Sequence, residues 1–310
     1  MAPSKIVRGK TWPSTLREYA RNNKAAATGL GLALAIVILL LAQSLALIAT
    51  GNAPVGFRNA SLGGLTAFAT TALGAMPAFF LRGIAQKVED SLLGMAAGMM
   101  LAASAFSLLI PGLAAGTEML DSKPLSAGIV VFGMALGVLL ILGLERFTPH
   151  QHLQSGPCGP GHERVQRIWL FVFAVALHNL PEGMAIGVSF AQNDLSVGLP
   201  LTTAIALQDI PEGLVVALAL RTAGFTPGQA VFAGIASGIP EVLGAILGVG
   251  LSSGLALAYP IGLGLAAGAM IFVVSHEVIP ETHRNSHQKH ATLGLMAGFA
   301  LMMVLDTTLG

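Results

Sequence analysis

Long apolar runs, separated by short polar breaks, dominate the pattern of this 310-residue chain. A membrane-spanning helix requires roughly 20 consecutive, mainly apolar residues. Nine runs come close to that length, and turn or charged residues bound them. The expected spans are 28–50, 63–84, 91–111, 126–144, 168–190, 199–220, 227–250, 256–279 and 291–308. The pattern therefore predicts an all-α fold, a polytopic membrane helix bundle.

Composition supports the same fold class. Hydrophobic residues make up 54% of the chain and charged residues 10%, whereas soluble domains carry about 25% charged residues. The 38 glycines suit helices that pack closely in a membrane. The single cysteine, Cys158, excludes an intramolecular disulfide and an all-cysteine metal site. A net charge of +1 gives no indication of a nucleic-acid partner.

The distribution of lysine and arginine predicts the orientation, because basic residues concentrate in cytoplasmic loops. With the N-terminus inside, 14 of the 16 basic residues fall on the cytoplasmic side, and only Arg58 and Lys123 fall outside. Residues 1–27 then form a basic cytoplasmic segment. The first span, 28–50, is too long for the apolar part of a signal peptide. The C-terminus is expected outside.

A repeated phrase carries the strongest chemical signal. Residues 178–183 read HNLPEG in the fifth span, and residues 208–213 read QDIPEG in the sixth. Helix positions i, i+1 and i+4 share one flank, so the polar residues of each phrase converge. Each proline removes a backbone donor and invites a kink, and broken helices line binding sites in transporters. The converging residues are His178, Asn179, Glu182, Gln208, Asp209 and Glu212.

The depth of these residues predicts a cation site. Both phrases lie at the middle of their spans, as does a third Pro-Glu pair at Glu241, and Met100 lies at the same depth in the third span. Each central carboxylate costs about 2.5–3.5 kcal/mol to insert, and no lysine or arginine within these spans offsets the four. Two divalent cations would neutralise the charge of −4. Partial protonation and a purely structural polar cluster are the alternatives.

The ligand types narrow the choice of ion. Imidazole, carboxylates and amide oxygens, with an optional thioether, suit Zn²⁺, Cd²⁺, Fe²⁺, Mn²⁺ or Co²⁺ better than Ca²⁺ or Mg²⁺. A closed tetrahedral site would indicate a structural zinc. This larger, mixed set favours a site that holds an ion briefly.

Two cytoplasmic loops also carry histidines. Residues 145–167 include His150, His152, Cys158 and His162, and residues 281–290 include His283, His287 and His290. Such spacing can hold a metal loosely, but a solvated loop with incidental histidines is an equally good interpretation.

Together these motifs resemble the ZIP (Zrt/Irt-like) family of metal transporters over about 250 residues. The resemblance implies a transporter domain over 63–308 with eight core helices, a three-two-three inverted-repeat arrangement, an extra leading helix at 28–50, and a homodimer in the bacterial inner membrane.

The resemblance to the ZIP family also implies two ions per protomer. His178, Glu182, Gln208, Glu212 and Met100 would serve one ion, Asn179, Asp209 and Glu241 the second, and Glu182 and Glu212 would bridge them. Many members carry Ser where Asn179 stands and His near Gln208, so an amide oxygen here takes the place of an imidazole. Ser107 to Pro111 and His276 to Pro280 echo each other at equal spacing, as a repeat requires.

The predicted orientation gives a route for the ion. It would enter past Asp306 and Ser107, bind at the centre, and leave past His276 and Glu277 towards the histidine loops, by an alternating-access type of mechanism. Each of these residues also has an ordinary structural interpretation, such as capping a helix end.

An intramembrane metallohydrolase is the competing class, but it would need a His-Glu-x-x-His motif. Pro280 stands where the second histidine after His276-Glu277 belongs, so we expect a protein that is not an enzyme. A non-transporting metal sensor or structural membrane protein is the third interpretation. Metal flux into proteoliposomes separates transport from both alternatives.

Overall fold

The computed structural model describes the backbone of residues 55–147, 150–152, 156–158, 167–252, 257–283 and 286–309, together with scattered residues between 20 and 50. The predicted segments 1–27 and 28–50 lie largely outside this part of the chain. Within it, seven helical segments are long and apolar enough to cross a membrane, and α7 adds another helix of 23 residues. The prediction of a polytopic membrane helix bundle is confirmed.

The described elements follow one another in a simple up-and-down order. Two π-helical turns, η2 and η4, join helices into continuous rods, α4–η2–α5 and α11–η4–α12. The bounds are α3 Phe57–Ala75, η1 Met76–Phe79, α4 Gln86–Ala103, η2 Ser104–Leu109, α5 Ile110–Leu120, α6 Lys123–Phe147, β1 His150–His152, β2 Gly156–Cys158, α7 Arg167–Ser189, α8 Leu195–Thr222, α9 Pro227–Ser237, α10 Ile239–Leu251, α11 Ala258–Val273, η4 Val274–Val278, α12 Ile279–Thr282 and α13 Gln288–Leu309.

Two predicted spans were wrong by more than a turn at both of their ends. The second span begins at Phe57 and ends at Phe79, so residues 80–84 lie beyond it. The third begins at Gln86 and continues to Leu120, which places Asp90 inside a helix instead of in a polar break. Asp90 is 1% exposed. Its burial requires polar partners from elsewhere in the fold.

The prolines of the repeated phrases do not interrupt their helices. Pro181 lies within α7, and Pro211 lies within α8. The third Pro-Glu pair behaves differently, because α9 ends at Ser237 and α10 begins at Ile239 with Pro240 in its first turn. A proline is tolerated there, since the first turn has no helical partner for that N–H. The break places Glu241 at the start of α10.

The predicted histidine loop contains a small hairpin that the all-α interpretation did not include. Strands β1 and β2 pair antiparallel, with His150 opposite Cys158 and His152 opposite Gly156. The helix before it, α6, extends to Phe147, so the connection is shorter than 145–167. The positions of the His150 and His152 side chains lie outside the described part.

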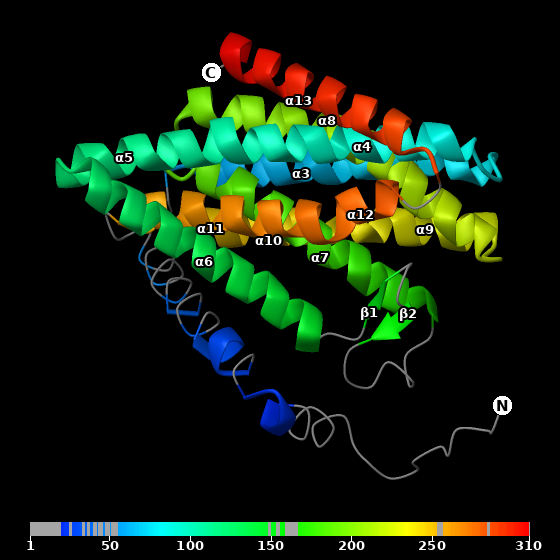
Figure 1. Ribbon diagram of the computed structural model, residues 1–310, viewed down its shortest axis with the longest axis horizontal. Coiled ribbons are helices and arrows are strands. Elements are labelled where there is room, and N and C mark those ends of the chain that lie inside the picture. Colours follow the sequence, from blue (N-terminus) through cyan, green and yellow to red (C-terminus); the bar gives the residue numbers. More distant parts are fainter. Residues whose placement is uncertain are drawn as a thin grey trace.

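The helices pack in pairs (Figure 1). The most extensive contacts join α4 with α13, α6 with α11, α7 with α10 and α3 with α8. Exchanging α3 with α9–α10, α4–α5 with α11–α12, α6 with α13, and α7 with α8 converts this set of pairs into itself. An inverted repeat requires such a pattern. The three-two-three arrangement itself stays a prediction.

Glycines let three of these pairs approach closely. A Cβ added at any of twelve glycines would overlap a backbone carbonyl oxygen of the partner helix. Small residues spaced by four hold membrane helices together in this way, because they let the backbones touch. The reciprocal sets are Gly94 and Gly98 with Gly294 and Gly298, Gly133 and Gly137 with Gly264 and Gly268, and Gly183 and Gly187 with Gly244 and Gly248.

The two ends of the bundle differ in their elements. The start of α4, the end of α12 and the start of α13 lie towards one end, which we name the α12 end (right in Figure 1). The end of α5 and the start of α6 lie at the other, the α5 end. The predicted orientation makes the α12 end cytoplasmic.

Candidate metal centre

Three carboxylates meet where α7 and α8 pass each other. One side-chain oxygen each from Glu182, Asp209 and Glu212 lies within 4.8 Å of the other two. Glu182 and Asp209 are buried, and Glu212 is partly buried. The helical spacing of the two phrases predicted this convergence, and the structure brings the residues together. The group has the ligand types and separations of a metal site.

Glu241 joins the group from the start of α10. Its Oε1 accepts hydrogen bonds from Asn179 Nδ2 at 2.9 Å and from Thr71 Oγ1 at 2.7 Å. Asn179 Nδ2 also donates to the carbonyl of Ser237 at 2.9 Å. Both partners of this amide nitrogen are acceptors, so the orientation of the Asn179 amide is fixed. Asn179 therefore ties α7 to the break between α9 and α10.

Each of four side chains in the site keeps one oxygen free. Gln208 Nε2 donates to Glu182 Oε1, just as Asn179 donates to Glu241. Buried polar atoms almost always have a partner, and an exception indicates a missing ligand such as an ion. Within the site, four buried oxygens lack a hydrogen-bond partner in the described part of the chain: Asn179 Oδ1, Glu182 Oε2, Gln208 Oε1 and Glu241 Oε2. Carboxylate and amide oxygens of this kind are typical ligands of divalent cations.

The negative charge of the site also favours a bound cation. Glu182 and Asp209 are each repelled by Glu212 and by Glu241. Nearby imidazole offers limited relief: His178 attracts Glu212, but its Nε2 is 2.7 Å from Glu277 Oε2. Four carboxylates near one histidine in a membrane interior would destabilise the fold by about 10 kcal/mol if left charged and unpaired, which is comparable to a whole domain's stability. A multivalent cation removes that penalty.

Met100 belongs to the hydrophobic core that surrounds parts of α7 and α8. It is 2% exposed on α4 and packs in the hydrophobic cluster that includes Ala185 and Ile205. Ala185 lies about one helical turn from Glu182 on α7, and Ile205 lies about one turn from Asp209 on α8. The role of Met100 as a ligand stays a prediction.

The predicted route residues lie on both sides of the site. Towards the α5 end, Ser107 Oγ donates to Asp306 Oδ1 at 2.7 Å, which joins η2 to α13. Towards the α12 end, η4 carries Glu277 beside His178, and His276 Nε2 lies 3.3 Å from Glu145 Oε1. Sequence reasoning separated Glu277 from His178, whereas the structure brings them into direct contact. Polar side chains thus lie on either side of the carboxylates.

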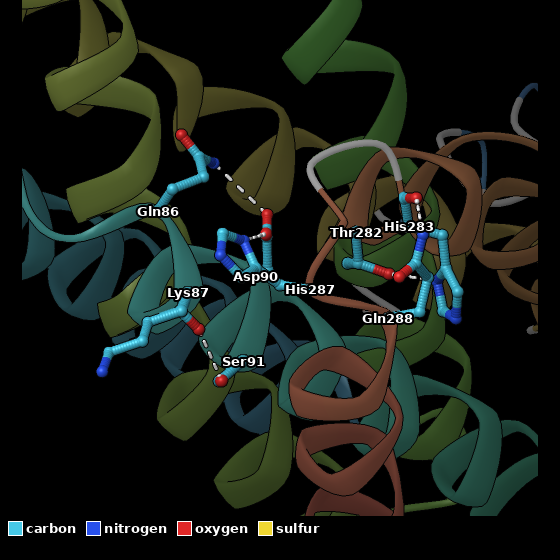
Figure 2. A network of polar contacts seen from close by, with 8 residues as sticks. All are labelled: Gln86, Lys87, Asp90, Ser91, Thr282, His283, His287 and Gln288. Carbon is cyan, nitrogen blue, oxygen red and sulfur yellow. Dashed lines mark hydrogen bonds and ion pairs between the residues drawn. The ribbon is translucent and has the colours of Figure 1, made fainter.

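A second polar cluster lies at the α12 end (Figure 2). Asp90 accepts from Gln86 at 3.2 Å, and its other oxygen is 3.0 Å from Nδ1 of His287 on the loop before α13. The ring of His283 contacts the Thr282 hydroxyl and the carbonyl of Ile279. The contacts with Gln86 and His287 explain how Asp90 is buried.

Sequence reasoning missed four residues of these networks, Thr70, Thr71, Asp90 and Glu145. Thr70 lies 3.5 Å from Asp209, and Thr71 contacts Glu241 across 170 positions of sequence. Both threonines lie in an Ala-, Gly- and Thr-rich span without a distinctive pattern. The position of Glu145, an acidic residue near the end of an apolar span, was the one available signal.

The fold and the site define a multi-pass membrane protein with a buried, carboxylate-rich candidate site for a cation. Comparisons with known proteins identify the family. The ZIP zinc transporter family model matches residues 148–306, more than half of the chain. The zinc transporter ZIPB of Bordetella bronchiseptica is 60% identical over 291 residues, 94% of each chain. GufA of Myxococcus xanthus, also a zinc transporter, is 40% identical over 79% of this chain and 97% of its own. Human zinc transporter ZIP11 is 28% identical over 81% and 97%.

The chain belongs to the ZIP family of zinc transporters. The resemblance inferred from the two phrases is confirmed, including the similarity to the Bordetella member that these phrases also suggested. Family membership makes the protein a transporter and not an enzyme, as the missing His-Glu-x-x-His motif predicted.

Proposed function

We propose that this protein carries Zn²⁺ across the membrane into the cytoplasm through the carboxylate site, with Cd²⁺ as a second substrate and Fe²⁺, Mn²⁺ and Co²⁺ as further candidates. The observation that carries the proposal is the set of four buried oxygens that have no hydrogen-bond partner among the described residues, placed among four carboxylates. The zinc transporters among its relatives support Zn²⁺ as the main ion.

The same oxygens support a site for two ions. His178, Glu182, Gln208, Glu212 and Met100 would hold one ion, and Asn179, Asp209 and Glu241 would hold the other, with Glu182 and Glu212 shared. The oxygens without hydrogen-bond partners can be assigned in the same way. Glu182 Oε2 and Gln208 Oε1 would coordinate the first ion, and Asn179 Oδ1 and Glu241 Oε2 would coordinate the second. Two divalent ions would balance the four carboxylates.

The route runs from the α5 end to the α12 end. Asp306 with Ser107 receives the ion, and Glu277, His276 and Glu145 accept it after the site. Because His178 contacts Glu277 directly, a single side-chain rotation can pass an ion from one to the other. The histidines of β1, His150 and His152, receive it at the cytoplasmic face. The N-terminus is cytoplasmic, the C-terminus periplasmic, and the protein works as a homodimer in the inner membrane by alternating access.

Radioactive Zn²⁺ flux into proteoliposomes tests the function. We expect time-dependent, saturable uptake that Cd²⁺ inhibits, and about two bound Zn²⁺ per chain in equilibrium dialysis. A folded protein that binds no transition metal at neutral pH would overturn the proposal.

The role of Asp306 can be tested separately. Asp306→Asn removes the charge that draws cations to Ser107, so we expect roughly tenfold more Zn²⁺ to be needed for half-maximal uptake at low salt, with a smaller effect at high salt. Glu118→Gln removes a charge from an exposed position on α5, at the same end of the bundle, and is the control. An unchanged concentration dependence in Asp306→Asn would remove this residue from the route.

A further inference from the structure

Thr71 controls one oxygen of a proposed metal ligand. The Glu241 carboxylate receives two hydrogen bonds, from Thr71 and from Asn179, and both reach the same oxygen, Oε1. The second oxygen, Oε2, has no hydrogen-bond partner in the described part of the chain. The two halves of this carboxylate are therefore unequal before any ion binds.

We propose that Thr71 is a positioning residue that restricts Glu241 to binding a metal through Oε2 alone, and that it thereby favours small ions such as Zn²⁺ over larger ions such as Cd²⁺. The proposal rests on the function proposed above, and it adds a determinant of selectivity outside the predicted ligand set.

The geometry holds the Thr71 hydroxyl in place. Thr71 is 2% exposed, and the β-branched side chain has few rotamers in a helix. Two glycines bring neighbouring helices against it: a Cβ on Gly213 would overlap the Thr71 carbonyl, and a Cβ on Gly238 would lie 3.2 Å from the Thr71 Cβ. The backbone of Thr71 is held against α8, and its side chain lies against the break between α9 and α10.

The Thr71 hydroxyl has one proton, and it donates this proton in a hydrogen bond to the Glu241 carboxylate. Thr71 Oγ1 lies 2.7 Å from Glu241 Oε1 and 3.2 Å from the carbonyl of Ala67. Hydrogen bonds to charged acceptors are shorter and stronger than those to neutral ones, so Glu241 is the preferred partner. The hydroxyl thus acts on Glu241 more than on its own helix.

Ion size connects this contact to selectivity. Zn²⁺ is usually four-coordinate and is satisfied by one oxygen per carboxylate. Ca²⁺ takes roughly six to eight oxygens and often binds both oxygens of a carboxylate, and Cd²⁺ is close to Ca²⁺ in size. A carboxylate whose Oε1 is occupied by two donors cannot turn both oxygens to the ion. Removing one donor relaxes this restriction and benefits the larger ion.

Paired binding and transport measurements on the full-length protein test the proposal. Thr71→Val keeps the side-chain shape and removes the donor, whereas Thr71→Ser keeps the donor. In equilibrium dialysis we expect Thr71→Val to shift the ratio of Zn²⁺ to Cd²⁺ affinity about tenfold towards Cd²⁺, and Thr71→Ser to preserve the wild-type ratio. The ratio of initial uptake rates in proteoliposomes should shift in the same direction.

A matched control separates position from general packing. Thr202 is buried on α8, its hydroxyl has no hydrogen-bond partner among the described residues, and Thr202→Val should leave the ratio unchanged. If Thr71→Val does not fold, Thr71→Ala removes the same donor with less bulk.

An equal loss of affinity for both ions, or an unchanged ratio in a folded variant, would overturn the role of Thr71. Wild-type Zn²⁺ flux tests the proposed transport independently, because the affinity ratio is measured without transport.

Discussion

Glu212→Gln is expected to abolish Zn²⁺ uptake while leaving the helix bundle folded. Glu212 contributes one of three oxygens that lie within 4.8 Å of each other, so its loss removes a ligand and a negative charge together. Changes to residues that merely support metal ligands cost about 10–100-fold in affinity, and we expect loss of this ligand to cost more than about 100-fold. Equilibrium dialysis and radioactive flux measure the two effects.

Without bound metal, Glu212→Gln should not lower the thermal stability of the protein. Glu212 repels Glu182 and Asp209, so neutralising it relieves repulsion, and the variant should melt at the same temperature as the wild type or higher without metal. Added Zn²⁺ should raise the melting temperature of the wild type only, because a ligand stabilises the state it binds. Glu118→Gln, at an exposed position on α5, is the control. Normal accumulation in Glu212→Gln would refute the assignment.

Local patterns made most of the site predictable from the sequence. His178, Asn179 and Glu182 share a helix flank because of their spacing, and the same rule applies to Gln208, Asp209 and Glu212. The structure confirms that carboxylates of both phrases meet. Nothing beyond helix geometry and the cost of charge in a membrane was needed.

Contacts between distant segments were not predictable in this way. Thr71 reaches Glu241 over 170 positions, and Asp90 is buried because His287 meets it from 197 positions away. In a single sequence Asp90 marks a polar break and therefore a loop. Only the packing of α13 against α4 shows that the carboxylate has a partner.

The two π-helical turns illustrate an intermediate case. The equal spacing of Ser107 to Pro111 and of His276 to Pro280 suggested a repeat, and each pair spans the end of a π-helical turn. A π turn adds one residue to a helix and often marks a functional site. Here the turns carry Ser107 and Glu277, which contact Asp306 and His178 respectively. The sequence revealed the correspondence but not the altered helix.

Gly183→Ala should damage both the fold and the metal site. A Cβ at Gly183 would overlap the backbone of Glu241 itself, so α10 has to move away from α7 at a proposed metal ligand. Overpacking of this kind costs about 1–3 kcal/mol. The displacement also separates Asn179 from Glu241, which should remove most Zn²⁺ binding. Thermal melts in detergent, with and without Zn²⁺, measure both effects.

A second glycine distinguishes the two effects. Gly187 meets the backbone of Ala245 in the same way, one turn further from Glu241, so Gly187→Ala should lower stability by a similar amount while retaining more Zn²⁺ binding. Gly128 on α6 has no neighbouring atom within 4 Å of an added Cβ, and Gly128→Ala should be neutral or slightly stabilising because alanine favours helix. If Gly183→Ala melted and bound Zn²⁺ as the wild type does, α7 and α10 could not approach as closely as the structure places them. The position of Glu241 in the proposed metal site depends on that approach, because its backbone is one of the points at which the two helices touch.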